Sequence, residues 1–278
     1  MTLRETVEAG AMILERAGVP DAKIDAWYLL EMVCHIDKNY YYMHGEDDIT
    51  EEQQRDYESV LKKRAERVPL QYITGEQEFM GLTFKVNSNV LIPRQDTEIL
   101  VEQALRVCQP GMRVLDMCTG SGCIIISMMK YQPDLIGEGA DVSKQALIQA
   151  KENARGNETS VEWICSDLFE RISEQYDVIV SNPPYIPTKI IETLMPEVRD
   201  FEPVEALDGK EDGLYFYREI VGKGIGYLKP NGYLFLEIGY DQAEAVTALM
   251  EDAGYSNIKV IRDLAGLDRV VMGQFVAL

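Results

Sequence analysis

One stretch decides the fold: residues 114–122 read VLDMCTGSG, and the apolar run CIII at residues 123–126 follows at once. An apolar run that ends in a glycine-containing turn and resumes as a helix-compatible run is typical of a strand, a tight turn and a helix. Glycine lets the backbone come close to a ligand, and the first turn of a helix offers N–H groups without partners inside the helix. The stretch therefore predicts a strand of an α/β sheet with a small-ligand site at its carboxyl end.

Downstream of this stretch, strand-like runs alternate with helical patterns, which predicts a mainly parallel, seven-stranded sheet with helices on both faces. The predicted strands are residues 113–117, 135–141, 161–167, 177–182, 232–238, 258–264 and 269–275. Only about four residues, AGLD, separate the last two runs, which is too short for a crossover helix. The final strand is therefore expected to be antiparallel.

Upstream, the pattern predicts a small helical bundle. Apolar residues recur at helical spacing from Leu3, Asp21 can cap a second helix, and Thr50 opens a third with the capping-box sequence TEEQ. Leu82 and Phe84 then alternate with polar residues, as in a hairpin. The expected division is a helical domain over residues 1–74, a β-hairpin linker over 75–95 and the α/β domain over 96–278.

Composition excludes several classes of protein. Twenty-seven basic and 47 acidic residues give a net charge of −20, which disfavours a DNA partner and allows a basic protein partner. Five cysteines without a C-x-x-C pair, and only two histidines, indicate neither a disulfide framework nor a metal site. The N-terminal MTLRETVEAG has no signal-peptide pattern, and no apolar run is long enough to span a membrane. We expect a cytoplasmic protein.

Three successive strands end in residues suited to a nucleoside that carries an amino acid. Asp116 precedes the T-G-S-G turn, which lacks the third glycine of the dinucleotide fingerprint and suits a cationic amino-acid end better than a phosphate. Asp141 lies about twenty residues further on, where a carboxylate can bind a ribose diol; as an alternative, it is only the N-cap of a helix starting near Val142. Asp167 and Leu168 end the third strand, as an adenine pocket requires.

The fourth strand breaks into the tetrapeptide Asn182-Pro183-Pro184-Tyr185. Its two prolines have no N–H, and each restricts the residue before it to extended conformations. The segment is therefore predicted to be a rigid platform of hydrogen-bond acceptors.

At this point the sequence resembles the HemK/PrmC family of protein-(glutamine-N5) methyltransferases, over nearly the whole chain. Shared segments are PLQYITG at 69–75, VLIPR at 90–94, VLDMCTGSG at 114–122, VSNPPYI at 180–186, FEP at 201–203, ALDG at 206–209, EDGL at 211–214, DLAG at 263–266 and DR at 268–269. The resemblance implies a Rossmann-like domain that binds S-adenosyl-L-methionine, with the helical domain docking the protein substrate. The implied substrate is the glutamine of the Gly-Gly-Gln loop of class-1 peptide chain release factors.

The resemblance also implies the roles of individual residues. The cofactor would be held by Asp116, Thr119, Gly120, Ser121, Gly122, Cys123, Asp141, Asp167, Leu168 and Asn182. The substrate glutamine would be held by Asn182 to Tyr185. The Asn182 oxygen and the Pro183 carbonyl would accept the two amide hydrogens and turn the nitrogen toward the methyl group, while Tyr185 would stack on the amide plane.

Two positions depart from the family pattern. Cys118 stands where many relatives have glycine, and Leu168 where some have tryptophan. Three alternatives remain open: a nucleic-acid adenine-N6 methyltransferase, a glutamine methyltransferase of a ribosomal protein, and a non-catalytic binding module.

Overall fold

The computed structural model describes residues 1–277 and divides into two compact units. The first contains Met1–Gly75 together with Met195–Phe201, and the second contains Glu76–Leu194 together with the chain from Glu202 onward. The sequence pattern gave no sign that residues 195–201 group with the N-terminal helices. Among the described residues, no helix is long and apolar enough to cross a membrane.

The first unit is helical, as predicted. Its helices are α1 (Leu3–Arg16), α2 (Ala22–Cys34), α3 (Lys38–His44), α4 (Glu51–Ala65), α5 (Leu70–Thr74) and α10 (Pro196–Phe201). A complete capping box at Thr50 and Gln53 starts α4 and confirms the predicted start. Asp21 precedes α2, but its side chain makes no cap bond. The apolar stripes of α1, α2 and α4 bury a shared core that includes Leu14, Leu30 and Leu61.

The second unit begins with the hairpin of β1 (Glu76–Phe79) and β2 (Leu82–Lys85), which pair antiparallel. Phe79 and Phe84 are almost completely buried, with ring centroids 6.0 Å apart. Both rings belong to the hydrophobic core of the second unit, so the hairpin is packed against the α/β domain.

The main sheet has seven strands in the order β5-β4-β3-β6-β7-β9-β8. They are β3 (Arg113–Met117), β4 (Ile136–Asp141), β5 (Val161–Cys165), β6 (Tyr176–Ser181), β7 (Leu228–Glu237), β8 (Ser256–Arg262) and β9 (Asp268–Gln274). The first five are parallel to one another, and β9 is antiparallel to both β7 and β8. The predicted antiparallel last strand is thus confirmed.

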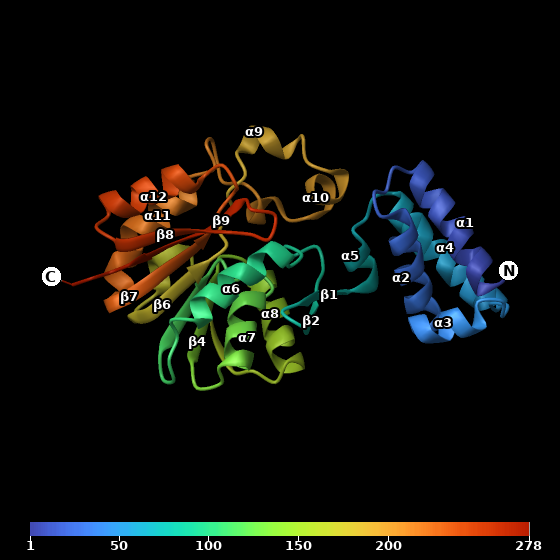
Figure 1. The fold of residues 1–278 in the computed structure, drawn as a ribbon, viewed down its shortest axis with the longest axis horizontal. Coiled ribbons are helices and arrows are strands. Elements are labelled where there is room, and N and C mark those ends of the chain that lie inside the picture. The colour runs from blue at the N-terminus through green and yellow to red at the C-terminus, as the bar shows by residue number, and fades with distance from the viewer. Residues whose placement is uncertain (278) are drawn as a thin grey trace. The chain divides into compact units, whose positions relative to one another are not determined.

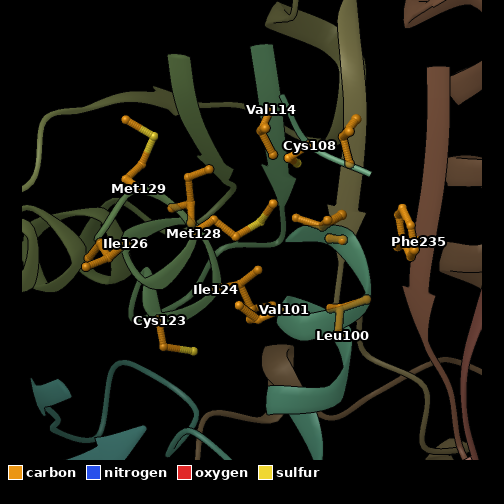
Figure 2. Close-up of a cluster of buried hydrophobic side chains, with 14 of the residues drawn as sticks. Leu100, Val101, Cys108, Val114, Cys123, Ile124, Ile126, Met128, Met129 and Phe235 are labelled. Carbon is orange, nitrogen blue, oxygen red and sulfur yellow. The ribbon is translucent and has the colours of Figure 1, made fainter. Parts of the chain in front are cut away.

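Successive residues of each strand point to opposite faces of the sheet, so the hydrophobic core has two layers. Val114 and Phe235 point toward one core cluster, and their neighbours Leu115 and Leu234 belong to the other. The first cluster lies under α6 (Glu98–Leu105) and α7 (Cys123–Tyr131), whose apolar side chains Figure 2 shows between these helices and the strands. The second lies under α11 (Tyr215–Gly224) and α12 (Ala243–Asp252) on the opposite face (Figure 1).

The remaining elements are short or lie beside the sheet. They are η1 (Gln95–Thr97), α8 (Lys144–Gly156), η2 (Leu168–Arg171), α9 (Thr188–Ile191), η3 (Val204–Ala206) and η4 (Ile225–Tyr227). Because β3, β4, β5 and β6 are parallel, their carboxyl ends lie at one edge of the sheet. The loops that follow these strands therefore meet there.

Candidate active site

A cavity of about 590 Å³ opens at the carboxyl edge of these strands, entirely within the second unit. Its volume suits a ligand the size of a nucleoside carrying an amino acid. Predicted site residues on its wall are Thr119, Gly120, Ser121, Cys123, Asp141, Asp167, Leu168, Asn182 and Pro184. Four other predicted residues, Asp116, Gly122, Pro183 and Tyr185, are not part of this wall.

Gly120 and Gly122 of the turn have different surroundings. Gly120 has a φ of +55°, and no atom lies within 4 Å of the position a Cβ would take. Gly122, at the N-cap of α7, has a φ of +81°, and a Cβ there would lie 2.9 Å from both Ile126 and Trp163. Gly120 therefore keeps the wall open to a ligand, and Gly122 allows α7 to pack closely against its neighbours.

Asp116 supports the loop from behind. It is completely buried, and its Oδ2 accepts a 2.5 Å hydrogen bond from the Thr119 hydroxyl. Burial raises the pKa of this carboxyl to about 7, and its Oδ1 has no partner among the described residues. Asp116 can therefore affect a ligand only indirectly, by holding the Thr119 side chain in place.

Asp141 fastens the glycine loop to the neighbouring strand. Its Oδ2 accepts the Gly120 N–H at 2.9 Å, and its Oδ1 accepts the Ser143 N–H at 2.8 Å. The next helix is capped by Ser143, whose hydroxyl accepts the Ala146 N–H, so the alternative that Asp141 is merely its N-cap is wrong. Each carboxylate oxygen can accept a further hydrogen bond, and Asp141 lines the cavity.

The backbone is strained at Cys118 and Leu168. Cys118 has a φ of +62° and Leu168 a φ of +45°, a region that residues with a Cβ seldom adopt. Both line the cavity. The Ser166 hydroxyl stabilises the Leu168 loop by donating to the Leu168 carbonyl at 2.7 Å and accepting the Arg171 N–H at 3.0 Å. Backbone strain of this kind collects where a site needs a fixed loop shape.

The predicted platform at the end of β6 is held at both ends. The Asn182 Nδ2 donates to the Thr97 hydroxyl at 3.3 Å. At the other end, the Tyr185 carbonyl accepts from the Gln242 Nε2 at 3.1 Å. The Gln242 oxygen in turn accepts the Gly239 N–H and the Tyr217 hydroxyl, which fixes its amide orientation.

The Tyr185 ring packs against the second core cluster instead of lining the cavity. Burial raises the pKa of its phenol, so the hydroxyl stays protonated. Pro183, within the platform, is buried.

Two glycines from the ALDG and EDGL segments cradle the platform backbone. A Cβ on Gly209 would lie 2.7 Å from the Tyr185 carbonyl carbon, and one on Gly213 would lie 2.4 Å from the Tyr185 oxygen. Ile186 also pairs with Asp208 through a short parallel bridge. These segments therefore hold the tetrapeptide from the side.

Charged residues of the other shared segments also meet here. Arg94, on the cavity wall, pairs with the buried Glu202 of the FEP segment. Arg269 contacts Asp96 at 3.2 Å and Asp263 at 3.0 Å. Most of these segments are recognisable in the sequence, but no sequence pattern points to Gln242, or to Glu237 at the end of β7. For Thr97, the only sequence signal is its position a few residues after the VLIPR segment.

Comparisons with known proteins agree with this architecture. Residues 5–75 match the family model of the PrmC N-terminal domain, and residues 94–195 match that of the methyltransferase small domain. A methyltransferase from Pyrococcus furiosus superposes with a TM-score of 0.54 at 16% identity, covering 71% of this chain and 90% of that chain. At that identity the likeness shows the fold alone, a class I methyltransferase fold.

Two curated relatives align along nearly their whole length. The release factor glutamine methyltransferase of Geobacter sulfurreducens is 40% identical over 274 residues, 98% of this chain and 96% of the relative. That of Thermodesulfovibrio yellowstonii is 43% identical over 253 residues, 88% of this chain and 90% of the relative. With this identity and coverage, the chain belongs to the family of release factor glutamine methyltransferases.

Proposed function

We propose that this protein transfers a methyl group from S-adenosyl-L-methionine to the side-chain amide nitrogen of the glutamine in the GGQ loop of class-1 release factors. The observation that carries this proposal is a shared cavity. Residues of the glycine turn after β3, Asp141 at the end of β4, and Asn182 and Pro184 of the platform after β6 all line it. A donor site and an acceptor platform are therefore adjacent.

The residues present fit the proposed cofactor. Asp141 has acceptor capacity left for a ribose diol, the wall is open at Gly120, and Leu168 offers an apolar surface for adenine. Thr119 and Cys123 complete the wall around the glycine turn. When bound, the cofactor supplies a methyl group on a positively charged sulfur, which is an electrophile strong enough to react with an amide nitrogen.

An amide nitrogen is a poor nucleophile because its lone pair is delocalised into the carbonyl. The chain must therefore orient it. The Asn182 oxygen and the Pro183 carbonyl accept the two N–H groups, so that the nitrogen faces the donor side of the cavity. Acceptors preorganised in this way also favour the positive charge that would develop on nitrogen as the sulfur–methyl bond breaks and S-adenosyl-L-homocysteine leaves. The nitrogen would then release its proton to solvent.

The five cysteines are all free thiols, as in proteins of a reducing compartment. We place the enzyme in the cytoplasm, where release factors act in the proposed reaction. The net charge of −20 suits a protein substrate better than a nucleic acid.

Transfer of labelled methyl groups tests the proposal. The enzyme is incubated with methyl-labelled S-adenosyl-L-methionine and a class-1 release factor, the same factor with its GGQ glutamine changed to alanine, ribosomal proteins, or duplex DNA. Label confined to the intact release factor is expected. Label in ribosomal protein or DNA, or in the altered factor, would overturn the assigned acceptor.

A matched pair of variants checks the assigned roles. Asn182→Ala is expected to lose nearly all turnover of the release factor while leaving cofactor affinity largely intact, because it removes an acceptor for the substrate amide. Asp141→Ala is expected to weaken cofactor affinity, measured by calorimetry, because it removes the ribose partner and the support of Gly120. Wild-type turnover in the first, or wild-type affinity in the second, would refute the corresponding role.

A further inference from the structure

Thr97 stands at an N-cap position but does not cap its helix. It precedes α6, where a threonine hydroxyl usually accepts a backbone N–H from the first turn. No such side-chain bond is formed here, although Thr97 is only 2% exposed. Its hydroxyl instead accepts the Asn182 Nδ2 at 3.3 Å, and it lies close enough to the Glu237 carboxyl to lower the pKa of that group. The Thr97 hydroxyl therefore contacts the platform instead of capping α6.

Glu237 is an unusual residue for its place in the fold. It is the last residue of β7, in the interior of the sheet, and is only 2% exposed. A carboxyl group buried at such a position costs free energy unless it is paired or hydrogen-bonded. Its favourable neighbours are the Thr97 hydroxyl and the positive charges of Arg269 and Arg94. Arg269 is itself held by Asp96 and Asp263, so the charge behind Thr97 has a fixed position.

The direction of the hydrogen bonds follows from the chemistry of each group. When the Glu237 carboxyl is ionised it only accepts, so the single Thr97 hydrogen is then directed to Glu237. A lone pair of the Thr97 oxygen is then left to accept from Asn182. Because the Asn182 amide is planar and its nitrogen donates to Thr97, its oxygen points away from Thr97. Asn182 is also one of the residues that line the cavity.

We propose that Thr97 and Glu237 are positioning residues that fix which arm of the Asn182 amide faces the acceptor. Without them, the amide can rotate by half a turn and present its NH₂ to the N–H groups of the substrate, donor against donor. This inference rests on the proposed function, because Asn182 needs its oxygen toward the substrate only if the acceptor is an amide or amine. A purely structural role would alter stability without altering turnover.

Thr97→Val removes the hydroxyl to which Asn182 donates and keeps the shape of the side chain. We expect kcat on the release factor to fall by about 10- to 100-fold, as for a misaligned reacting group. The KM for the release factor and the calorimetric Kd for S-adenosyl-L-methionine should stay within about twofold of wild type. Thr97→Ser keeps the hydroxyl and should restore most of kcat. The matched control is Thr247→Val, since the Thr247 hydroxyl is buried without a partner among the described residues.

Glu237 is tested by two substitutions of similar size. Glu237→Gln keeps an oxygen that can accept from Thr97, and Glu237→Leu does not. We expect the Leu variant to lose kcat as Thr97→Val does, with the Gln variant retaining more. Equal kcat in the two variants would contradict the assigned role of Glu237.

A second measurement needs no turnover. In ¹⁵N-labelled enzyme, the side-chain amide signals of Asn182 are identified by their loss in Asn182→Asp. They should shift in Thr97→Val and remain close to wild type in Thr97→Ser and Thr247→Val. Unshifted signals in Thr97→Val, or a wild-type kcat in that variant, would overturn the inference. If the wild type failed to methylate the release factor, the proposed function would fail, and the amide signals alone would decide the orientation of Asn182.

Discussion

Cys118 shows how one side chain can stand where the backbone favours glycine. Its φ of +62° is in the left-handed region, and the neighbouring Gly120 and Gly122 have similar values. A residue with a Cβ pays about 1–2 kcal/mol for this conformation, which the surrounding structure must offset. The half-buried Cys118 packs against the second core cluster, and that contact supplies part of the compensation.

Substitutions at Cys118 should therefore depend on backbone shape. Cys118→Gly is expected to keep kcat, because glycine accepts the observed φ without strain. Cys118→Val should lower the free energy of unfolding by about 1–3 kcal/mol, because a β-branched residue tolerates this φ poorly. Urea denaturation measures the effect, with Cys165→Val on the extended strand β5 as control. Equal losses at both cysteines would contradict the strain argument.

The buried Glu237 should make stability depend on pH. Burial raises its pKa from the usual 4.5 to about 7, while Thr97 and the nearby Arg269 and Arg94 act in the opposite sense and Asp96 adds to the rise. The folded state therefore holds a proton that the unfolded state loses near pH 4.5. The resulting contribution to stability is complete below about pH 4.5 and is lost as the pH rises through about 7.

Glu237→Gln removes this titration. The free energy of unfolding of the wild type, minus that of the variant, should fall between about pH 4.5 and 8, by at most about 3 kcal/mol at 1.36 kcal/mol per pKa unit. Denaturation series at several pH values measure both proteins. Asp116, whose pKa is also raised to about 7, is present in both and cancels. Two parallel stability curves would contradict the prediction.

At the scale of elements, the loops between β6 and α11 form a support for the platform. The ALDG and EDGL segments contribute glycines because no Cβ fits beside the Tyr185 backbone. Gln242, at the start of α12, donates to the same Tyr185 carbonyl. The tetrapeptide thus keeps its shape through contacts from three separate segments.

Gly213→Ala should disrupt this support. Its Cβ would lie 2.4 Å from the Tyr185 oxygen and 2.8 Å from the Gln242 Nε2, at a φ of +75°. We expect kcat to fall by about 100-fold, since small displacements of positioning groups have effects of that size. Gly254→Ala is the control, because its φ of +89° imposes the same strain in open space. If both variants lost kcat equally, strain alone would account for the loss.

At the scale of the whole molecule, the chain leaves the α/β unit after Leu194 and returns at Glu202. In between, Glu197 accepts hydrogen bonds from Arg64 at 2.9 Å and from Arg67 at 2.5 and 2.7 Å. Arg64 also donates to Asp25 at 2.6 Å. Since these side chains are mostly buried, α10 is held to the helical unit by a desolvated charge cluster.

Glu197→Ala should release this segment. Removing one member of a buried charge cluster leaves the others uncompensated and costs about 3–5 kcal/mol. Hydrogen exchange is expected to rise in residues 195–201 and in α4, with no rise in the main sheet. Asp200→Ala, which removes an exposed pair on the same helix, should leave exchange unchanged. Unchanged exchange in Glu197→Ala would show that other contacts hold α10.

The sequence by itself determined the α/β class, the antiparallel last strand, the glycine turn and the Asn182 platform. These follow from patterns that are local in the chain: hydrophobic periodicity, turn residues and prolines act within a few positions. The tertiary structure alone decided which residues support that platform. Thr97 and Asn182 lie 85 positions apart, and Gln242 and Tyr185 lie 57 apart. It also placed Asp116 behind the cavity wall and grouped residues 195–201 with the helical unit. Such pairs meet only after the strands have taken their order in the sheet, and no local periodicity encodes them.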